Sequence, residues 1–211
     1  MLYWLLYQRL YFHFAPHLSS FRIFRYVTFR TAFASLTALF MALIIGPAII
    51  RMLREFQIGQ YIREEGPQAH QKKAGTPTMG GVLINIAIVI PTLLWADLSN
   101  PFIWLVIFAT VAFGAIGFTD DYLKVINKRN LGLTGKTKLV LQFAVSLAIG
   151  AVLMMLNVHK QYSTQLIVPF FKQFRPDLVI DAMRHNPHLW PLAFAPFLIV
   201  VMLVIVFSSN A

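Results

Sequence analysis

Residues 98–119 read LSNPFIWLVIFATVAFGAIGFT, an uncharged stretch that runs directly into Asp120-Asp121-Tyr122-Leu123-Lys124. A stretch of this length can cross the hydrocarbon core of a bilayer, which takes roughly 20 residues in a helix. Two adjacent carboxylates and a lysine therefore stand where a membrane helix reaches water. Ionised groups are costly near lipid, so their presence at this boundary points to a function.

The composition agrees with a membrane location, since 58% of the 211 residues are hydrophobic and only 12% are charged. Four more uncharged stretches have a comparable length: residues 31–50, 74–96, 139–159 and 189–207. Backbone amides in lipid must be satisfied within their own segment, and these stretches lack the alternation of barrel strands. The sequence predicts an all-α polytopic membrane protein with five transmembrane helices in a single domain, residues 1–211.

Residues 1–20 are apolar and aromatic but carry Arg9 where a signal peptide would have its uncharged core. Aromatic side chains recur there at near-helical spacing, at Tyr3, Trp4, Tyr7 and Tyr11. This pattern predicts an interfacial helix at the lipid headgroups, with a mobile apolar tail as the alternative.

The distribution of Lys and Arg predicts the orientation. Residues 51–78 and 120–138 carry five each, against four in the first 30 residues and four in residues 157–190. The positive-inside rule then makes 51–78 and 120–138 cytoplasmic loops, places the N-terminus outside and makes 157–190 an external loop. Residues 165–174 of that loop favour a short hairpin.

The net charge of +10 indicates an anionic partner, which in a membrane protein is first the lipid headgroups. Nucleic acid is therefore not expected as a partner. With no cysteine in the chain, disulfide and thiolate chemistry are excluded. The histidines are too scattered along the sequence to predict a metal site: His13, His17, His70, His159, His185 and His188.

Asp120 and Asp121 lie close enough to repel one another unless a cation neutralises them. A magnesium ion held by one or two carboxylates and by substrate phosphate oxygens would do so. Lys124, at i+4 from Asp120, suits either a surface ion pair or an anion clamp. The alternative is that the two carboxylates only mark where a helix leaves lipid.

Residues 75–81, Gly-Thr-Pro-Thr-Met-Gly-Gly, follow Lys72 and Lys73. Backbone amides and cations in this arrangement suit a phosphate or pyrophosphate, although an ordinary loop entering a helix has the same composition. Residues 132–137 look like a P-loop but have Asn130 where that motif needs glycine, so we reject this interpretation. Asn85 is an isolated polar residue in an apolar stretch, so we expect its side chain to form an interhelical hydrogen bond.

Three runs together resemble phospho-N-acetylmuramoyl-pentapeptide transferase, within the polyprenyl-phosphate N-acetylhexosamine-1-phosphate transferases. They are KAGTPTMGG at 73–81, GFTDDYLK at 117–124 and NLGLT at 130–134. The resemblance covers the whole chain. It implies a bacterial inner-membrane enzyme of peptidoglycan synthesis that moves phospho-MurNAc-pentapeptide from UDP to undecaprenyl phosphate, giving lipid I and UMP with Mg²⁺.

Carried over by position, the resemblance implies that Asp120 and Asp121 are catalytic. Asp120 is expected to act as the base that readies the lipid phosphate, and Asp121 to support the metal or the nucleotide. The remaining candidates are expected to bind substrate: Lys73, Thr76, Lys124, Lys138 and Asn210. A homodimer is left open.

The family is expected to continue beyond Asn210 into further helices, another catalytic aspartate and a His-rich loop, so these 211 residues are expected to be an N-terminal portion that is inactive alone. One alternative is a sister transferase that moves a different N-acetylhexosamine 1-phosphate. Another is a non-catalytic membrane protein. A transporter is disfavoured, because internal repeats and charge within a span are not visible.

Overall fold

The computed structural model describes residues 2–11, 19–56, 79–127, 131–166, 175–180, 183 and 190–210. Regular structure in these ranges is helical, apart from one isolated antiparallel bridge between Gln165 and Asp177. The predicted all-α class is confirmed. The chain divides into two compact units, Met1–Thr134 and Gly135–Ala211, which are described separately.

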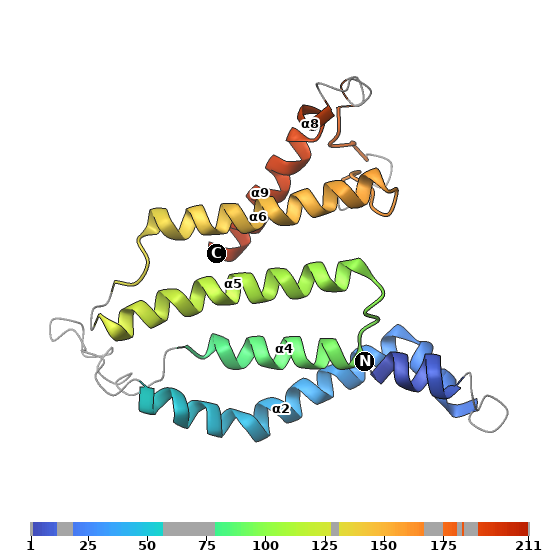
Figure 1. Ribbon diagram of the computed structural model, residues 1–211, viewed down its shortest axis with the longest axis vertical. Coiled ribbons are helices and arrows are strands. Elements are labelled where there is room, and N and C mark those ends of the chain that lie inside the picture. Colours follow the sequence, from blue (N-terminus) through green and yellow to red (C-terminus); the bar gives the residue numbers. More distant parts are fainter. Residues whose placement is uncertain are drawn as a thin grey trace. The chain divides into compact units, whose positions relative to one another are not determined.

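The first unit contains α2 (Val27–Phe56), α4 (Gly81–Trp95) and α5 (Pro101–Ile126), preceded by the short helices η1 (Trp4–Tyr11) and η2 (Ser19–Arg25). Helix α4 packs against both α2 and α5 (Figure 1). The start of α5 is encoded locally, because the Asn100 side chain accepts a hydrogen bond from Phe102 N at 3.0 Å and Pro101 occupies the first helical position.

Aromatic and polar contacts join α2 to α4 near residue 95. Trp95 Nε1 donates a hydrogen bond to Thr37 Oγ1 at 3.0 Å, and its ring lies 5.3 Å from that of Phe33. The N-terminal segment is helical as predicted over Trp4–Tyr11. Tyr3, which directly precedes this helix, stacks on Tyr7, and the Arg30 guanidinium lies over the Tyr3 ring. Its location at the headgroups stays a prediction.

Helix α4 meets α5 at a glycine. The position of a Cβ on Gly114 would lie 2.5–2.7 Å from the amide group of Asn85. Asn85 donates to Gly81 O of its own helix at 3.0 Å, and its buried Oδ1 has no hydrogen-bond partner among the residues that the structure describes. The interhelical hydrogen bond predicted for Asn85 is therefore wrong, and its contact with α5 is steric.

The second unit is built on α6 (Gly135–Val158), which packs against α9 (Ala195–Asn210) next to the short α8 (Trp190–Ala193) (Figure 1). Gln142, Ser146 and Gly150 recur every fourth residue on the buried side of α6. Polar and small residues at this spacing allow two apolar helices to approach closely. A small core of Val179, Ala193 and Phe194 closes the end of this unit.

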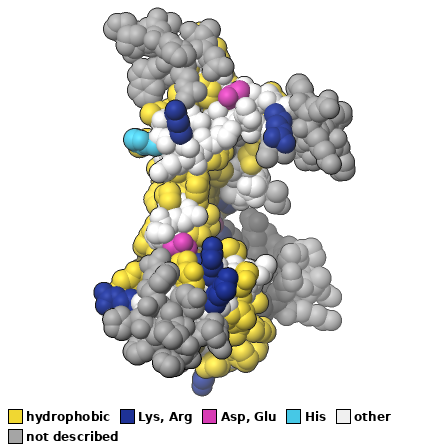
Figure 2. Space-filling model, turned by 90° about the vertical axis from the view of Figure 1, so that its right-hand side faces the viewer, with side chains coloured by type: hydrophobic (Ala, Val, Ile, Leu, Met, Phe, Trp, Pro, Cys, Tyr) yellow, Lys and Arg dark blue, Asp and Glu magenta, His cyan; other side chains and the backbone are white. Residues whose placement is uncertain are grey.

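Among the described residues, three helices are long and apolar enough to cross a membrane: Val27–Leu53 within α2, α5 and α6. Helices α4 and α9 are apolar but shorter, with 15 and 16 residues. Large hydrophobic side chains are exposed along the helices, as lipid-facing surfaces require (Figure 2). These are the helices of a polytopic membrane protein.

The helix bounds differ from those of the predicted spans. Helix α4 begins at Gly81, whereas the apolar stretch begins at 74; residues 74–78 lie outside the described residues. Helix α5 continues past the predicted end at 119 to Ile126. Of the predicted hairpin at 165–174, only Gln165 and Leu166 are described, and Gln165 takes part in the bridge to Asp177.

Candidate active site at the end of helix α5

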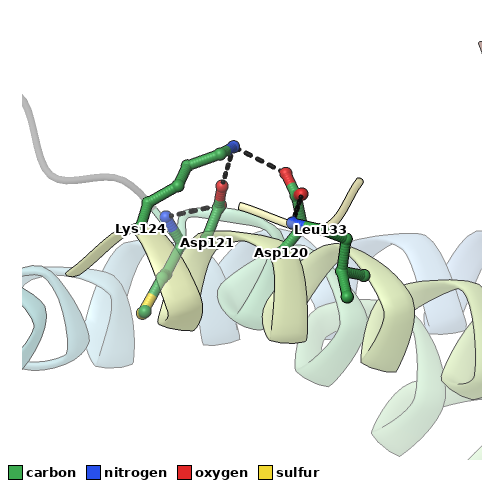
Figure 3. A network of polar contacts seen from close by, with 5 residues as sticks. Asp120, Asp121, Lys124 and Leu133 are labelled. Atoms are coloured by element: carbon green, nitrogen blue, oxygen red, sulfur yellow. Dashed lines mark hydrogen bonds and ion pairs between the residues drawn. The ribbon is translucent and has the colours of Figure 1, made fainter. Parts of the chain in front are cut away.

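Asp120, Asp121 and Lys124 lie in the last two turns of α5, within the helix and not in the loop after it. Helical spacing brings Lys124 back over both carboxylates. Its Nζ lies 2.6 Å from Asp120 Oδ2 and 3.0 Å from Asp121 Oδ1 (Figure 3). One ammonium group thus offsets one of the two negative charges that the sequence places on neighbouring residues.

The other oxygen of each carboxylate accepts a hydrogen bond from the backbone of a different segment. Leu133 N donates to Asp120 Oδ1 at 2.8 Å (Figure 3). Met79 N donates to Asp121 Oδ2 at 3.3 Å. The two aspartates therefore connect α5 to the residues before α4 and to the residues after α5. Both carboxylates are partly buried, with 19% and 30% of their side chains exposed.

Two local features allow these backbone groups to reach the aspartates. Met79 is buried and has a φ of 70°, a left-handed conformation that is uncommon for a residue with a side chain. A Cβ on Gly132 would collide with Asp120 O and Asp120 Oδ1. The contributions of Met79, Gly132 and Leu133 were not predicted from the sequence, although all three lie in the runs that carry the family resemblance.

The structure does not place the remaining predicted site residues relative to this cluster. Lys73 and Thr76 lie outside the described residues. Lys138, in α6, and Asn210, at the end of α9, belong to the second unit. There the Asn210 amide pairs with the buried Gln142, donating to Oε1 at 2.8 Å.

Asp120 and Asp121 suit a magnesium ion of the kind that the resemblance implies. Asp120 Oδ2 and Asp121 Oδ1 converge on one cation, Lys124 Nζ, and a hard divalent ion bound to phosphate needs only one or two protein carboxylates. In the described ranges, no group of three or more His, Asp or Glu side chains could hold a metal. Phosphate oxygens or other protein groups would have to complete the coordination.

The chain was compared with known proteins. Residues 73–84, which include Met79 of this cluster, match a family model described as phospho-N-acetylmuramoyl-pentapeptide-transferase signature 1. The phospho-N-acetylmuramoyl-pentapeptide-transferase of Koribacter versatilis is 64% identical over 100% of the chain and 55% of its own length. The chain is related to these transferases along its whole length.

Two further proteins of the same name agree. That of Acidobacterium capsulatum is 66% identical over 89% of the chain and 49% of its own length, and that of Solibacter usitatus is 56% identical over 100% of the chain and 55% of its own length. The family resemblance read from the sequence is confirmed. The chain spans about half the length of the curated relatives it matches.

Proposed function

We propose that the protein carrying this sequence transfers phospho-MurNAc-pentapeptide from UDP-MurNAc-pentapeptide to undecaprenyl phosphate, which yields lipid I and UMP for peptidoglycan synthesis. The observation that carries the proposal is the convergence of Asp120 and Asp121 on one cation at the end of a membrane helix. The relationship to transferases of this name supports the choice of reaction.

In this reaction, an oxygen of the lipid phosphate forms a bond to the β-phosphorus of the sugar nucleotide, and the bond from that phosphorus to the UMP oxygen breaks. UMP leaves with the electron pair of the broken bond. Asp120 orients the lipid phosphate and accepts its proton when it is still protonated. Asp121 holds the metal or the nucleotide. The roles of Asp120 and Asp121 both require a carboxylate at the membrane boundary, where the lipid phosphate meets the sugar nucleotide.

The basic residues bind phosphate groups in this proposal. Lys124 already faces the aspartates and can shift between them and a substrate phosphate, since its ammonium lies on a flexible stem. Lys73 and Lys138 neutralise the diphosphate, and Thr76 and Asn210 bind substrate by hydrogen bonds. Mg²⁺, when bound, supplies Lewis-acid stabilisation of the charge on the transferring phosphoryl group.

The proposed location is the bacterial inner membrane, with the site on the cytoplasmic face and the N-terminus outside. The ten Lys and Arg residues in segments 51–78 and 120–138 support this orientation. Among sister enzymes that transfer other N-acetylhexosamine 1-phosphates, the muramoyl reaction is favoured by the match of residues 73–84 to the muramoyl signature.

The test is an Asp120→Asn variant of the whole protein in membranes, assayed for UMP release from UDP-MurNAc-pentapeptide with undecaprenyl phosphate. Asparagine retains an oxygen that can accept from Leu133 N but loses the charge, so we expect the rate to fall at least about 100-fold with the protein still folded. The matched control is Asp97→Asn, in the turn before α5, where Asp97 Oδ1 accepts from Ser99. An unchanged rate in Asp120→Asn would overturn the proposal.

We also expect the 211 residues expressed alone to release no UMP, because the resemblance places another catalytic aspartate outside them. A purified 211-residue protein assayed beside the whole protein checks this. Turnover by the shorter protein at a comparable rate would show that the cluster on α5 is sufficient.

A further inference from the structure

Gly132 lies against Asp120 so closely that its position leaves no room for a side chain. A Cβ at this position would overlap Asp120 O and Asp120 Oδ1 and would lie 2.8 Å from Asp120 Cγ. Real Cβ atoms essentially never approach other atoms this closely. One of the obstructing atoms is a backbone carbonyl oxygen of α5, which cannot rotate away as a side chain can.

The glycine is required here for space and not for backbone conformation. The φ of Gly132 lies outside the left-handed range in which glycine is favoured. Alanine could therefore adopt the same backbone angles, and its methyl group alone would push residues 131–134 away from Asp120. By contrast, a Cβ at Gly135, three residues further along, meets no atom within 4 Å.

Because Gly132 approaches Asp120 so closely, the next residue can bond to the carboxylate: Leu133 N lies 2.8 Å from Asp120 Oδ1. This hydrogen bond occupies one oxygen of the carboxylate and leaves Oδ2 to Lys124. A charge-assisted bond to a backbone N–H fixes both the rotamer of the side chain and the direction of its remaining lone pairs. Asp121 receives a longer bond, 3.3 Å, from Met79 N.

We propose that Gly132 is a positioning residue that acts through Asp120: by having no side chain, it lets Leu133 N–H hold Asp120 in the orientation that the transfer reaction requires. This inference rests on the function proposed above. A carboxylate displaced by about 1 Å can cost on the order of 100-fold in rate, even when substrate binding is unaffected. The inference predicts a loss in kcat with little change in KM.

The first experiment measures hydrogen exchange of residues 131–134 in the whole protein by mass spectrometry, with no substrate present. We expect Gly132→Ala and Asp120→Ala each to accelerate exchange at Leu133 by about tenfold or more, because each removes the same hydrogen bond. The double variant should exchange no faster than the single variants, and Gly135→Ala should exchange like the wild type. Unchanged exchange in Gly132→Ala would overturn the inference, whatever the protein catalyses.

The second experiment measures steady-state kinetics of UMP release for Gly132→Ala and Gly135→Ala. We expect Gly132→Ala to lower kcat about 10- to 100-fold with KM for the sugar nucleotide within about twofold and only a small fall in melting temperature, and Gly135→Ala to keep the wild-type kcat. A loss of kcat accompanied by an equal loss of folded protein would assign Gly132 a structural role only. If the wild-type protein releases no UMP but the exchange result is as expected, the proposed function is wrong while the contact between Gly132 and Asp120 stands.

Discussion

At the level of single residues, Lys124 is the centre of the candidate site. It contacts both carboxylates while 30% of its side chain remains exposed, so a substrate can reach it. The sequence offered two roles for it, a surface ion pair or an anion clamp. The structure shows the ion pair, with both aspartates as partners, and the clamp is the use proposed for the same ammonium during transfer.

We expect Lys124→Met to lower the rate of UMP release by about 10- to 1000-fold, because it removes the cation that faces both aspartates and the phosphates. Its effect on stability should be small, since a partly exposed ion pair contributes about 0–1 kcal/mol. Lys124→Arg keeps the charge and should retain more activity than Met. Kinetics and thermal unfolding in detergent provide the comparison, and a fully active Met variant would contradict the assigned role.

The charged residues of the site could be predicted from the sequence because Asp120, Asp121 and Lys124 are close along one helix. Helical periodicity alone brings i and i+4 together. The contacts from Met79 and Leu133 could not be predicted in this way, because they use backbone N–H groups of distant segments. Such groups carry no residue-type signal, and only the glycine at 132 and the unusual φ at Met79 mark them.

At the level of helices, α4 and α5 depend on the absence of a side chain at Gly114. We expect Gly114→Ala to destabilise the protein by about 1–3 kcal/mol, because its methyl group would overlap the Asn85 amide. Asn85→Ala makes room for the methyl group, so the double variant should recover most of the loss. Thermal unfolding checks this, with Gly117→Ala, where a Cβ meets no atom within 4 Å, as the control. If the losses of stability from the two single changes add up in the double variant, the contact between Gly114 and Asn85 is contradicted.

Helices α6 and α9 are joined by the amide pair Gln142 and Asn210. We expect Gln142→Leu to cost about 0.6–2 kcal/mol, because it removes a buried interhelical partner of the Asn210 amide. Changing both residues to leucine should cost less than the sum of the single changes, since an apolar pair leaves no buried amide unsatisfied. Strict additivity in thermal unfolding would show that the pair does not interact.

The bounds of the helices were less predictable than their helical and apolar character. Hydropathy marks where a segment is apolar, but a helix continues as long as its backbone can be hydrogen-bonded, so α5 extends seven residues beyond the uncharged stretch, to Ile126. Helix α4 is instead shorter than the apolar stretch, because the described chain forms a turn at Met79 and Gly80 before the helix starts. The glycines of that stretch gave a signal for the turn.

At the level of the whole molecule, the account depends on which side of the membrane each segment faces. Helix α5 separates the turn containing Ser99 from the segment containing Leu131, and its length and hydropathy suit a membrane span. The proposed function needs Lys73 on the same side as Leu131, because both segments must contribute to one phosphate-binding site. These 211 residues contain no cysteine, so a cysteine introduced at one of these positions is the only one within this sequence.

The most direct test is labelling of Lys73→Cys, Ser99→Cys and Leu131→Cys with a membrane-impermeant maleimide, in intact and in permeabilised spheroplasts. Ser99 and Leu131 are exposed positions, which makes both suitable reporters. We predict that Ser99→Cys reacts in intact spheroplasts, and that Lys73→Cys and Leu131→Cys react only after permeabilisation. Reaction of Lys73→Cys and Leu131→Cys from opposite sides would contradict the account, because no single site could then contain both segments.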